Sequence, residues 1–139
     1  MSSPPWSTRV RTRIGRRGAM LAVLSVIDIV YGLAMFLTDL VLDAKPQWWP
    51  ASIYSMFGLS VGIWGVVWMV VGAFLLSGIP KEIPDSIHFG AAVALWVWWA
   101  FAAMVYYFTT FSPGTWGPAA VYAGFSLLIL IAAGWEDPP

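Results

Sequence analysis

The sequence has no cysteine and little charge, and both absences limit what the protein can be. Without cysteine among its 139 residues, the chain cannot form disulfides, iron–sulfur clusters, cysteine zinc sites or a catalytic thiolate. Only 10% of its residues are charged, whereas soluble domains carry about 25%. Because 60% of the residues are hydrophobic and the mean hydropathy is +0.77, the composition predicts an integral membrane protein with one compact domain.

Histidine is equally scarce, since His88 is the only one in the chain. One histidine at a membrane edge, with no partner predicted at its depth, provides neither a Ser-His-Asp triad nor a metal site. The glycines follow no strand, so they form no phosphate-binding loop. We therefore expect no enzymatic activity, no cofactor and no bound metal.

Long apolar runs are abundant, and they divide the chain into four predicted helices. Each run is close to or above the ~20 residues that cross a hydrocarbon core as a helix. The predicted spans are residues 19–42, 51–78, 86–110 and 118–134. The predicted fold is all-α: an integral membrane bundle of four transmembrane helices, within a domain of residues 18–135. The short connections predict that successive helices are antiparallel neighbours.

The first span follows a polar segment, residues 1–17, which is predicted to be disordered. Five of the seven basic residues lie in it: Arg9, Arg11, Arg13, Arg16 and Arg17. Such a run can bind nucleic acid, but its place before an apolar run instead predicts contact with anionic headgroups of the bilayer. We expect no nucleic-acid partner. The apolar run is too long for a signal-peptide core and contains an acid, so it predicts an uncleaved signal anchor.

The basic residues also predict the orientation of the chain. Four spans place both termini on one side, which then carries six Lys and Arg residues, the arm and Lys81, against Lys45 alone on the other. The positive-inside rule therefore predicts cytoplasmic termini, including a short acidic tail at residues 136–139, in a multi-pass membrane protein. The ten tryptophans are typical of interface anchors.

Two acids lie in the first span. Asp39 is near its end, within reach of the headgroups, whereas Asp28 is about 14 Å in from Ala19 and close to the midplane. A carboxylate there costs ~3 kcal/mol, so it must be protonated, paired or exposed to a wet interior. Helical spacing places Asp28 on one stripe with Ser25, Gly32, Met35 and Asp39, and the small residues predict that this stripe faces protein. Two interpretations stay open: a proton-sensitive or pore-lining group, or a neutral acid that holds the bundle together.

The second span carries a seam of small residues, at alternating spacings of three and four. Its members are Ser55, Gly58, Gly62, Gly65, Met69 and Gly72. Such a seam is typical of a closely packed helix. It predicts either self-association into a homo-oligomer or packing against another span of the same chain. The opposite side is predicted to face lipid, and consists of Phe57, Trp64, Trp68, Val71 and Leu75.

The third span begins with His88, which lies within one turn of the predicted cytoplasmic end. We expect it to bond headgroups or backbone, and to reach Asp28 only through helix tilt or a water. Its helical stripe is predicted to face inward, and continues with Ala91, Ala92, Leu95, Trp99, Ala102 and Tyr106.

Four short blocks resemble small four-span, holin-like membrane proteins of actinobacterial bacteriophages, over residues 16–138. The blocks are IDIVYG at 27–32, WGVVWMVVG at 64–72, FGAA at 89–92 and AGWEDP at 133–138. In those proteins a basic residue often stands at the position of Trp96, where it could partner the acid that matches Asp28.

The resemblance implies a phage product in the host plasma membrane, with a part in host lysis. A holin-like protein permeabilises or remodels the membrane through helix association and needs no active site. Two other classes stay open: a non-enzymatic membrane anchor or scaffold, and a small bundle that conducts protons or solutes through Asp28.

Overall fold

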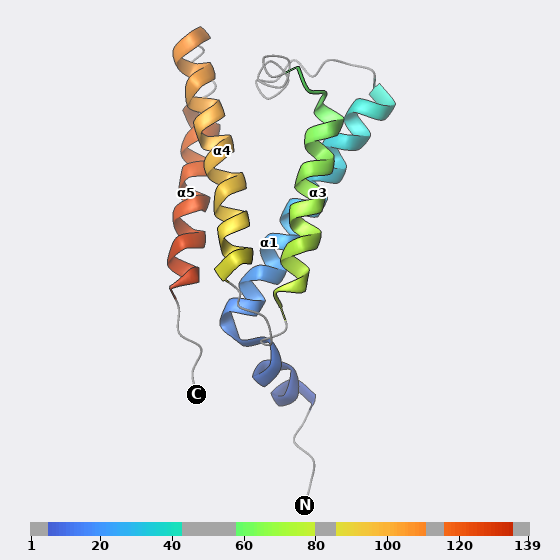
Figure 1. Cartoon of the computed structure of the whole chain (residues 1–139), viewed down its shortest axis with the longest axis vertical. Coiled ribbons are helices and arrows are strands. Elements are labelled where there is room, and N and C mark those ends of the chain that lie inside the picture. The colour runs from blue at the N-terminus through green and yellow to red at the C-terminus, as the bar shows by residue number, and fades with distance from the viewer. Residues whose placement is uncertain (1–5, 43–57, 80–85, 111–115, 135–139) are drawn as a thin grey trace, which may run out of the picture.

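The computed structural model describes residues 6–42, 58–79, 86–110 and 116–134. These residues form four helices: α1 (Trp6–Leu42), α3 (Val61–Ser77), α4 (Ser86–Thr110) and α5 (Trp116–Ala133). The helices alternate in direction, so that the start of α1 and the end of α5 lie at the same end of the molecule (Figure 1). The described ranges contain no strand, which confirms the all-α fold.

The first helix is longer than predicted, because it begins at Trp6. The prediction that residues 1–17 are disordered is therefore wrong from Trp6 onward. Arginine is among the better helix formers, so the basic arm can continue the helix. Gly15 interrupts it with φ 64° and ψ −179°, a backbone conformation that glycine reaches without the clash of a Cβ. The interruption separates Arg9, Arg11 and Arg13 from the apolar segment, whereas Arg16 and Arg17 lie on the apolar side of it.

The second predicted span is shorter than expected, because α3 begins only at Val61. Ser60 is its N-cap, and the Ser60 hydroxyl accepts a hydrogen bond from the Ile63 N–H at 3.2 Å. Gly58 precedes the cap with φ 68°, so it is not a helical member of the predicted seam. The span predicted at 51–78 is therefore wrong at residues 58–60, and residues 51–57, which include Ser55, lie outside the described residues.

The last two helices lie where they are predicted. The bounds of α4 are those expected, residues 86–110, and α5 begins two residues earlier and ends one residue earlier than the predicted 118–134. Pro118 lies in the first turn of α5, where a missing N–H breaks no helical hydrogen bond. The acidic tail predicted at residues 136–139 is outside the described part of the chain.

The first two helices form a close antiparallel hairpin. A Cβ built on Gly65 would lie 2.6 Å from the Gly32 carbonyl oxygen, and one on Gly32 would lie 2.5 Å from the Gly65 carbonyl oxygen. Further along, the Ser25 hydroxyl donates a 2.6 Å hydrogen bond to the Gly72 carbonyl. The glycine seam of α3 therefore packs against the small-residue stripe of α1 in the same chain, one of the two arrangements that the sequence leaves open.

The last two helices form a second hairpin, which is packed by rings. Trp96 of α4 stacks on Phe125 of α5 with 4.7 Å between ring centroids. Trp99 lies 6.2 Å from Tyr122, also on α5. The inward stripe of α4 is confirmed, because His88, Ala92, Leu95, Trp99 and Ala102 are buried.

The two hairpins meet through side chains and share far fewer close backbone approaches than the helices within each hairpin. Trp68 of α3 lies 5.2 Å from Trp96 and 6.0 Å from Trp99 between ring centroids. Trp68 and Leu75 are fully buried, so the prediction that this side of the second span faces lipid is wrong for both. Hydropathy cannot separate a lipid-facing ring from a core ring, since both environments are apolar.

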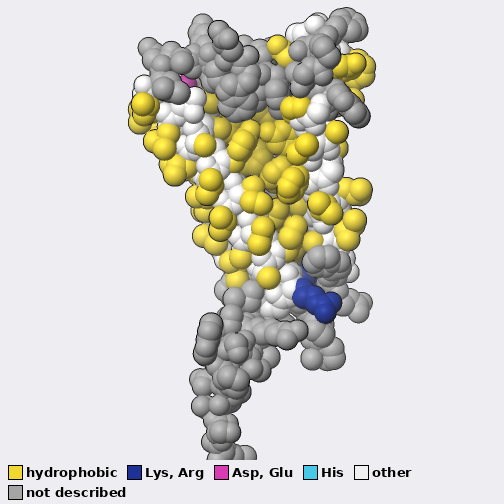
Figure 2. All heavy atoms as spheres, turned by 180° about the vertical axis from the view of Figure 1, so that it is seen from behind, with side chains coloured by type: hydrophobic (Ala, Val, Ile, Leu, Met, Phe, Trp, Pro, Cys, Tyr) yellow, Lys and Arg dark blue, Asp and Glu magenta, His cyan; other side chains and the backbone are white. Residues whose placement is uncertain are grey.

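The outer surface of the described helices is broadly apolar (Figure 2). All four helices expose large aliphatic or aromatic side chains, among them Val26, Val30, Ile63, Val70, Val97, Phe101, Leu127 and Ile131. The described Lys and Arg side chains gather at one end of this surface (Figure 2). Among the described residues, two helices are long and apolar enough to cross a membrane, Gly15–Val41 and Ser86–Thr110, while Val61–Ser77 and Gly117–Ala133 are apolar but shorter.

Candidate functional site

Asp28 is the centre of the candidate site. It is the middle residue of the Gly15–Val41 segment and is 0% exposed. Neither oxygen of its carboxylate has a hydrogen-bond partner of good geometry. The sequence predicts that Asp28 faces protein, and this is confirmed. A buried polar group without partners is rare in folded proteins and is often linked to function.

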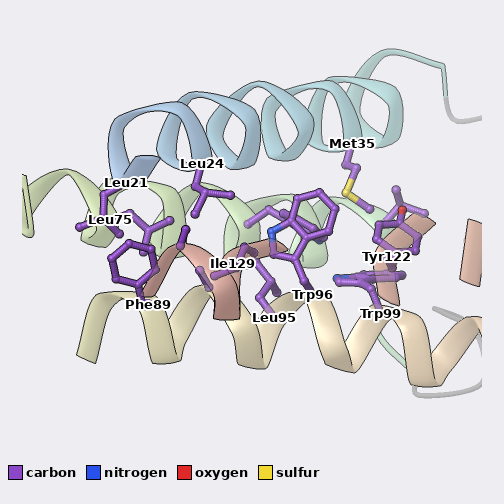
Figure 3. Close-up of a cluster of buried hydrophobic side chains, with 14 residues drawn as sticks. Leu21, Leu24, Met35, Leu75, Phe89, Leu95, Trp96, Trp99, Tyr122 and Ile129 are labelled. Atoms are coloured by element: carbon purple, nitrogen blue, oxygen red, sulfur yellow. The ribbon is translucent and has the colours of Figure 1, made fainter. Parts of the chain in front are cut away.

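Trp96 is a polar neighbour that α4 supplies to Asp28. The indole N–H of Trp96 is directed toward the carboxylate, but the geometry is too poor for a hydrogen bond, and that N–H has no other partner. Figure 3 shows Trp96 extending from α4 toward α1, with Trp99 and Tyr122 farther along the same cluster. The fold thus brings together the two positions, 28 and 96, that the family resemblance pairs.

Aromatic rings surround this junction. Trp68 is at its centre: its indole is 4.9 Å from the Tyr31 ring and 5.2 Å from the Trp96 ring, both edge to face. The indole N–H of Trp68 is also buried without a hydrogen-bond partner. The Tyr31 hydroxyl on α1 and the Tyr122 hydroxyl on α5 form a 2.9 Å hydrogen bond, which joins the two hairpins.

Reasoning from the residue pattern missed Tyr31 and Tyr122 as members of this site, and Trp96 entered only through the family resemblance. A signal existed on α5, where the buried residues recur at spacings of three and four, namely Ala119, Tyr122, Ser126, Ile129 and Ala132. That pattern predicts a single inward face with Tyr122 on it. For Trp96 no comparable signal exists, because every neighbouring residue on α4 is also apolar.

His88 belongs to a separate contact between the hairpins. Its Nε2 is hydrogen-bonded to the Ser77 hydroxyl at 3.0 Å, and its ring stacks on Phe74 with 4.5 Å between centroids. The expectation that His88 bonds headgroups or backbone is wrong, because the side chain is buried and bonds a hydroxyl. Its bonded nitrogen faces α3, so His88 and Asp28 do not form a pair.

Asp39 lies at the far end of α1 and is exposed. A Cβ built on Gly62 would lie 2.5 Å from an Asp39 carboxylate oxygen, so the missing side chain of Gly62 makes room for this acid. Gly62 is in the first turn of α3, where the backbone N–H groups and the helix dipole favour a negative charge. Asp39 therefore supports the start of α3.

The arginines lie at the opposite end of α1. The Arg17 guanidinium carbon is 5.5 Å from the centroid of the Phe89 ring, a cation–π distance. Arg16 is exposed, and the side chains of Arg9, Arg11 and Arg13 are outside the described part. The predicted contact with lipid headgroups is not tested by these positions.

The described residues contain no group of three or more His, Asp, Glu or Cys side chains that could hold a metal ion. Comparison with protein-family models, with curated proteins and with solved structures gave no match. The chemistry of the buried residues is therefore the basis for a functional assignment.

Proposed function

We propose that this chain is a holin-like, multi-pass membrane protein that permeabilises the plasma membrane of a bacterial host when its two hairpins separate. The observation that carries the proposal is the unpartnered carboxylate of Asp28, buried where the hairpins meet. Membrane residence is supported by the large apolar side chains that all four helices expose, since soluble monomers rarely expose such continuous apolar surface.

The packing indicates where the molecule would open. Within the first hairpin the backbones touch at Gly32 and Gly65, which lets dispersion forces and close approach hold the helices in lipid. Between the hairpins the described contacts are side-chain contacts, among them ring pairs, one tyrosine pair, the Ser77–His88 bond and the Arg17–Phe89 contact. Rings can exchange protein neighbours for lipid more readily than touching backbones can, so the junction between the hairpins is the part expected to separate.

Burial of Asp28 destabilises the closed arrangement of the two hairpins when the acid is charged. A charged carboxylate without partners costs ~3 kcal/mol at the centre of a bilayer, and it is relieved when water or a second copy of the chain reaches it. Because the glycine seam is already occupied by α1, association between copies would use the ring-lined faces exposed by opening. Homo-oligomers would therefore form through the hairpin junction and not through the glycine seam.

Permeabilisation tests the proposal. Dye release would be measured from bacteria that express the full chain at matched levels. The wild type is expected to release dye, and Asp28→Asn, which keeps the shape but cannot ionise, is expected to release it roughly 100-fold more slowly if a ~3 kcal/mol drive is lost. Asp39→Asn is the matched control, since Asp39 is exposed at a helix end, and it should behave as the wild type.

Each other outcome has a definite meaning. Release by Asp28→Asn at the wild-type rate would reject the role of Asp28. A wild type that dissipates the proton gradient without releasing dye would favour the conducting bundle, which the Tyr31–Tyr122 hydroxyl pair supports as a second candidate. No release of either kind would leave the anchor or scaffold class.

The orientation of the chain is tested separately. The start of α1 and the end of α5 lie at the same end of the molecule (Figure 1). With four spans, six of the seven Lys and Arg residues are expected on that side of the membrane. A reporter fused after Pro139 is therefore expected to be active when it requires the cytoplasm and silent when it requires export. Activity of an export-dependent reporter at that position would reject either the four spans or the cytoplasmic termini.

A further inference from the structure

Asp28 lacks a counter-charge in the described part of the fold. The described Lys and Arg side chains are Arg16 and Arg17, and Arg17 is eleven residues away along α1, a rise of about 16 Å. The polar group that another helix brings to Asp28 is the indole N–H of Trp96 on α4, which carries no charge. When it ionises, this carboxylate carries a negative charge that no described side chain neutralises.

The rings around Asp28 provide the second half of a binding site. Tyr31 lies 4.9 Å from Trp68, Trp68 lies 5.2 Å from Trp96, and Trp96 lies 5.6 Å from Tyr122, all between ring centroids. The four rings come from four different helices, so they form one cluster across the hairpin junction. The faces of Trp and Tyr rings attract cations, and such clusters bind quaternary ammonium groups.

The route to the site limits the ligand further. Asp28 and Trp68 are fully buried, and the helices around them expose aliphatic side chains on their outer faces. A small hydrated ion gains nothing from rings and cannot enter through an apolar wall cheaply, whereas a cation wrapped in hydrocarbon can enter from lipid between the hairpins.

We propose that Asp28, together with the rings of Tyr31, Trp68, Trp96 and Tyr122, binds a lipophilic organic cation at the hairpin junction. The Asp28 carboxylate neutralises the charge of the cation. The aromatic rings contact its apolar groups in place of the lipid tails that surround it in the bilayer. The proposal rests on the proposed function in one respect, because the ligand enters by the same separation of hairpins. It adds a ligand class that the permeabilising role does not require.

Binding of tetraphenylphosphonium to the purified full chain in detergent tests this site, with radiolabelled probe and equilibrium dialysis. Wild type should bind saturably, and Asp28→Asn should bind about 30-fold or more weakly, as expected when one partner of a buried charge pair is lost. Asp28→Glu keeps the charge and should retain most of the affinity. Asp39→Asn is the control for removal of an acid elsewhere. Helix content of every variant is checked by circular dichroism.

The anion tetraphenylborate, which has nearly the same shape, separates charge recognition from hydrophobic uptake. Saturable binding of the cation but not of the anion supports the site. Equal binding of both ions, or equal binding of the cation to wild type and Asp28→Asn, overturns it. If dye release is lost on Asp28→Asn and the cation is not bound by the wild type, the site fails while the permeabilising role stands. If the cation is bound and no dye is released, the permeabilising role fails while the site stands.

Discussion

Gly65→Leu is expected to break the first hairpin and to cause one of the two largest losses of stability on α3. A Cβ at this position would already lie 2.6 Å from the Gly32 carbonyl oxygen and 2.7 Å from the Phe36 backbone nitrogen. These are backbone atoms, so no rotamer change can relieve the overlap, and the helices must move apart. Overpacking of a core costs 1–3 kcal/mol and sometimes more, and we expect ~3 kcal/mol or above here.

The matched control is Gly124→Leu on α5. A Cβ built on Gly124 meets nothing within 4 Å, so the same substitution should leave stability unchanged or raise it by up to ~1 kcal/mol through helix propensity. Thermal unfolding in detergent, followed by circular dichroism, measures both. At 2–4 °C per kcal/mol, the midpoint of Gly65→Leu should fall by about 10 °C. Equal midpoints for the two variants would mean that α1 and α3 do not pack through this seam.

The second large effect is expected at Trp68, which holds the two hairpins together. Its indole is 0% exposed and contacts rings from α1 and α4. Trp68→Ala removes all of these contacts and leaves a cavity, so we expect a loss of 3–5 kcal/mol. Trp98→Ala removes the same atoms from a side chain that is 38% exposed, and should lose ~1 kcal/mol or less.

Trp68→Phe distinguishes the ring from its N–H group. The indole N–H of Trp68 has no hydrogen-bond partner, so phenylalanine keeps most of the packing and removes a buried donor that is unsatisfied. We expect this variant to lose less than ~1.5 kcal/mol. A loss as large as that of Trp68→Ala would show that a phenyl ring cannot replace the packing of the indole at this junction. A Trp98→Ala loss equal to that of Trp68→Ala would contradict the central place of Trp68.

Trp64 shows how the structure changes an expectation drawn from spacing alone. The sequence predicts that Trp64→Leu leaves the packing intact, because the residue is opposite the glycine seam. The ring is instead half-buried and lies 5.5 Å from the Trp99 ring across the hairpin junction. We now expect an effect between those of Trp98→Ala and Trp68→Ala.

Local sequence determined the helices and much of their inward faces. Apolar runs of sufficient length predict α4 at its true bounds, and helical spacing predicts that Asp28 and the stripe of His88 point into the protein. These properties depend on the period of the helix and on the cost of placing an acid in lipid, both of which act within a single segment. The start of α3 at Val61 also depends on local sequence, because Gly58 and the Ser60 N-cap precede it. The apolar pattern alone does not show these two signals.

Only the tertiary structure decided which faces meet. Spacing shows that Gly62, Gly65 and Gly72 line one side of α3, but not whether that side meets α1 or a second copy. Spacing also predicts that Trp68 faces lipid, and it does not predict the surroundings of Trp96 or Tyr122. All three rings lie at the hairpin junction. The physical reason is that lipid and protein core are equally apolar, so hydropathy ranks no face above another. Close approach of Gly32 to Gly65 fixes the first hairpin, and that arrangement leaves the aromatic side of α3 to meet α4.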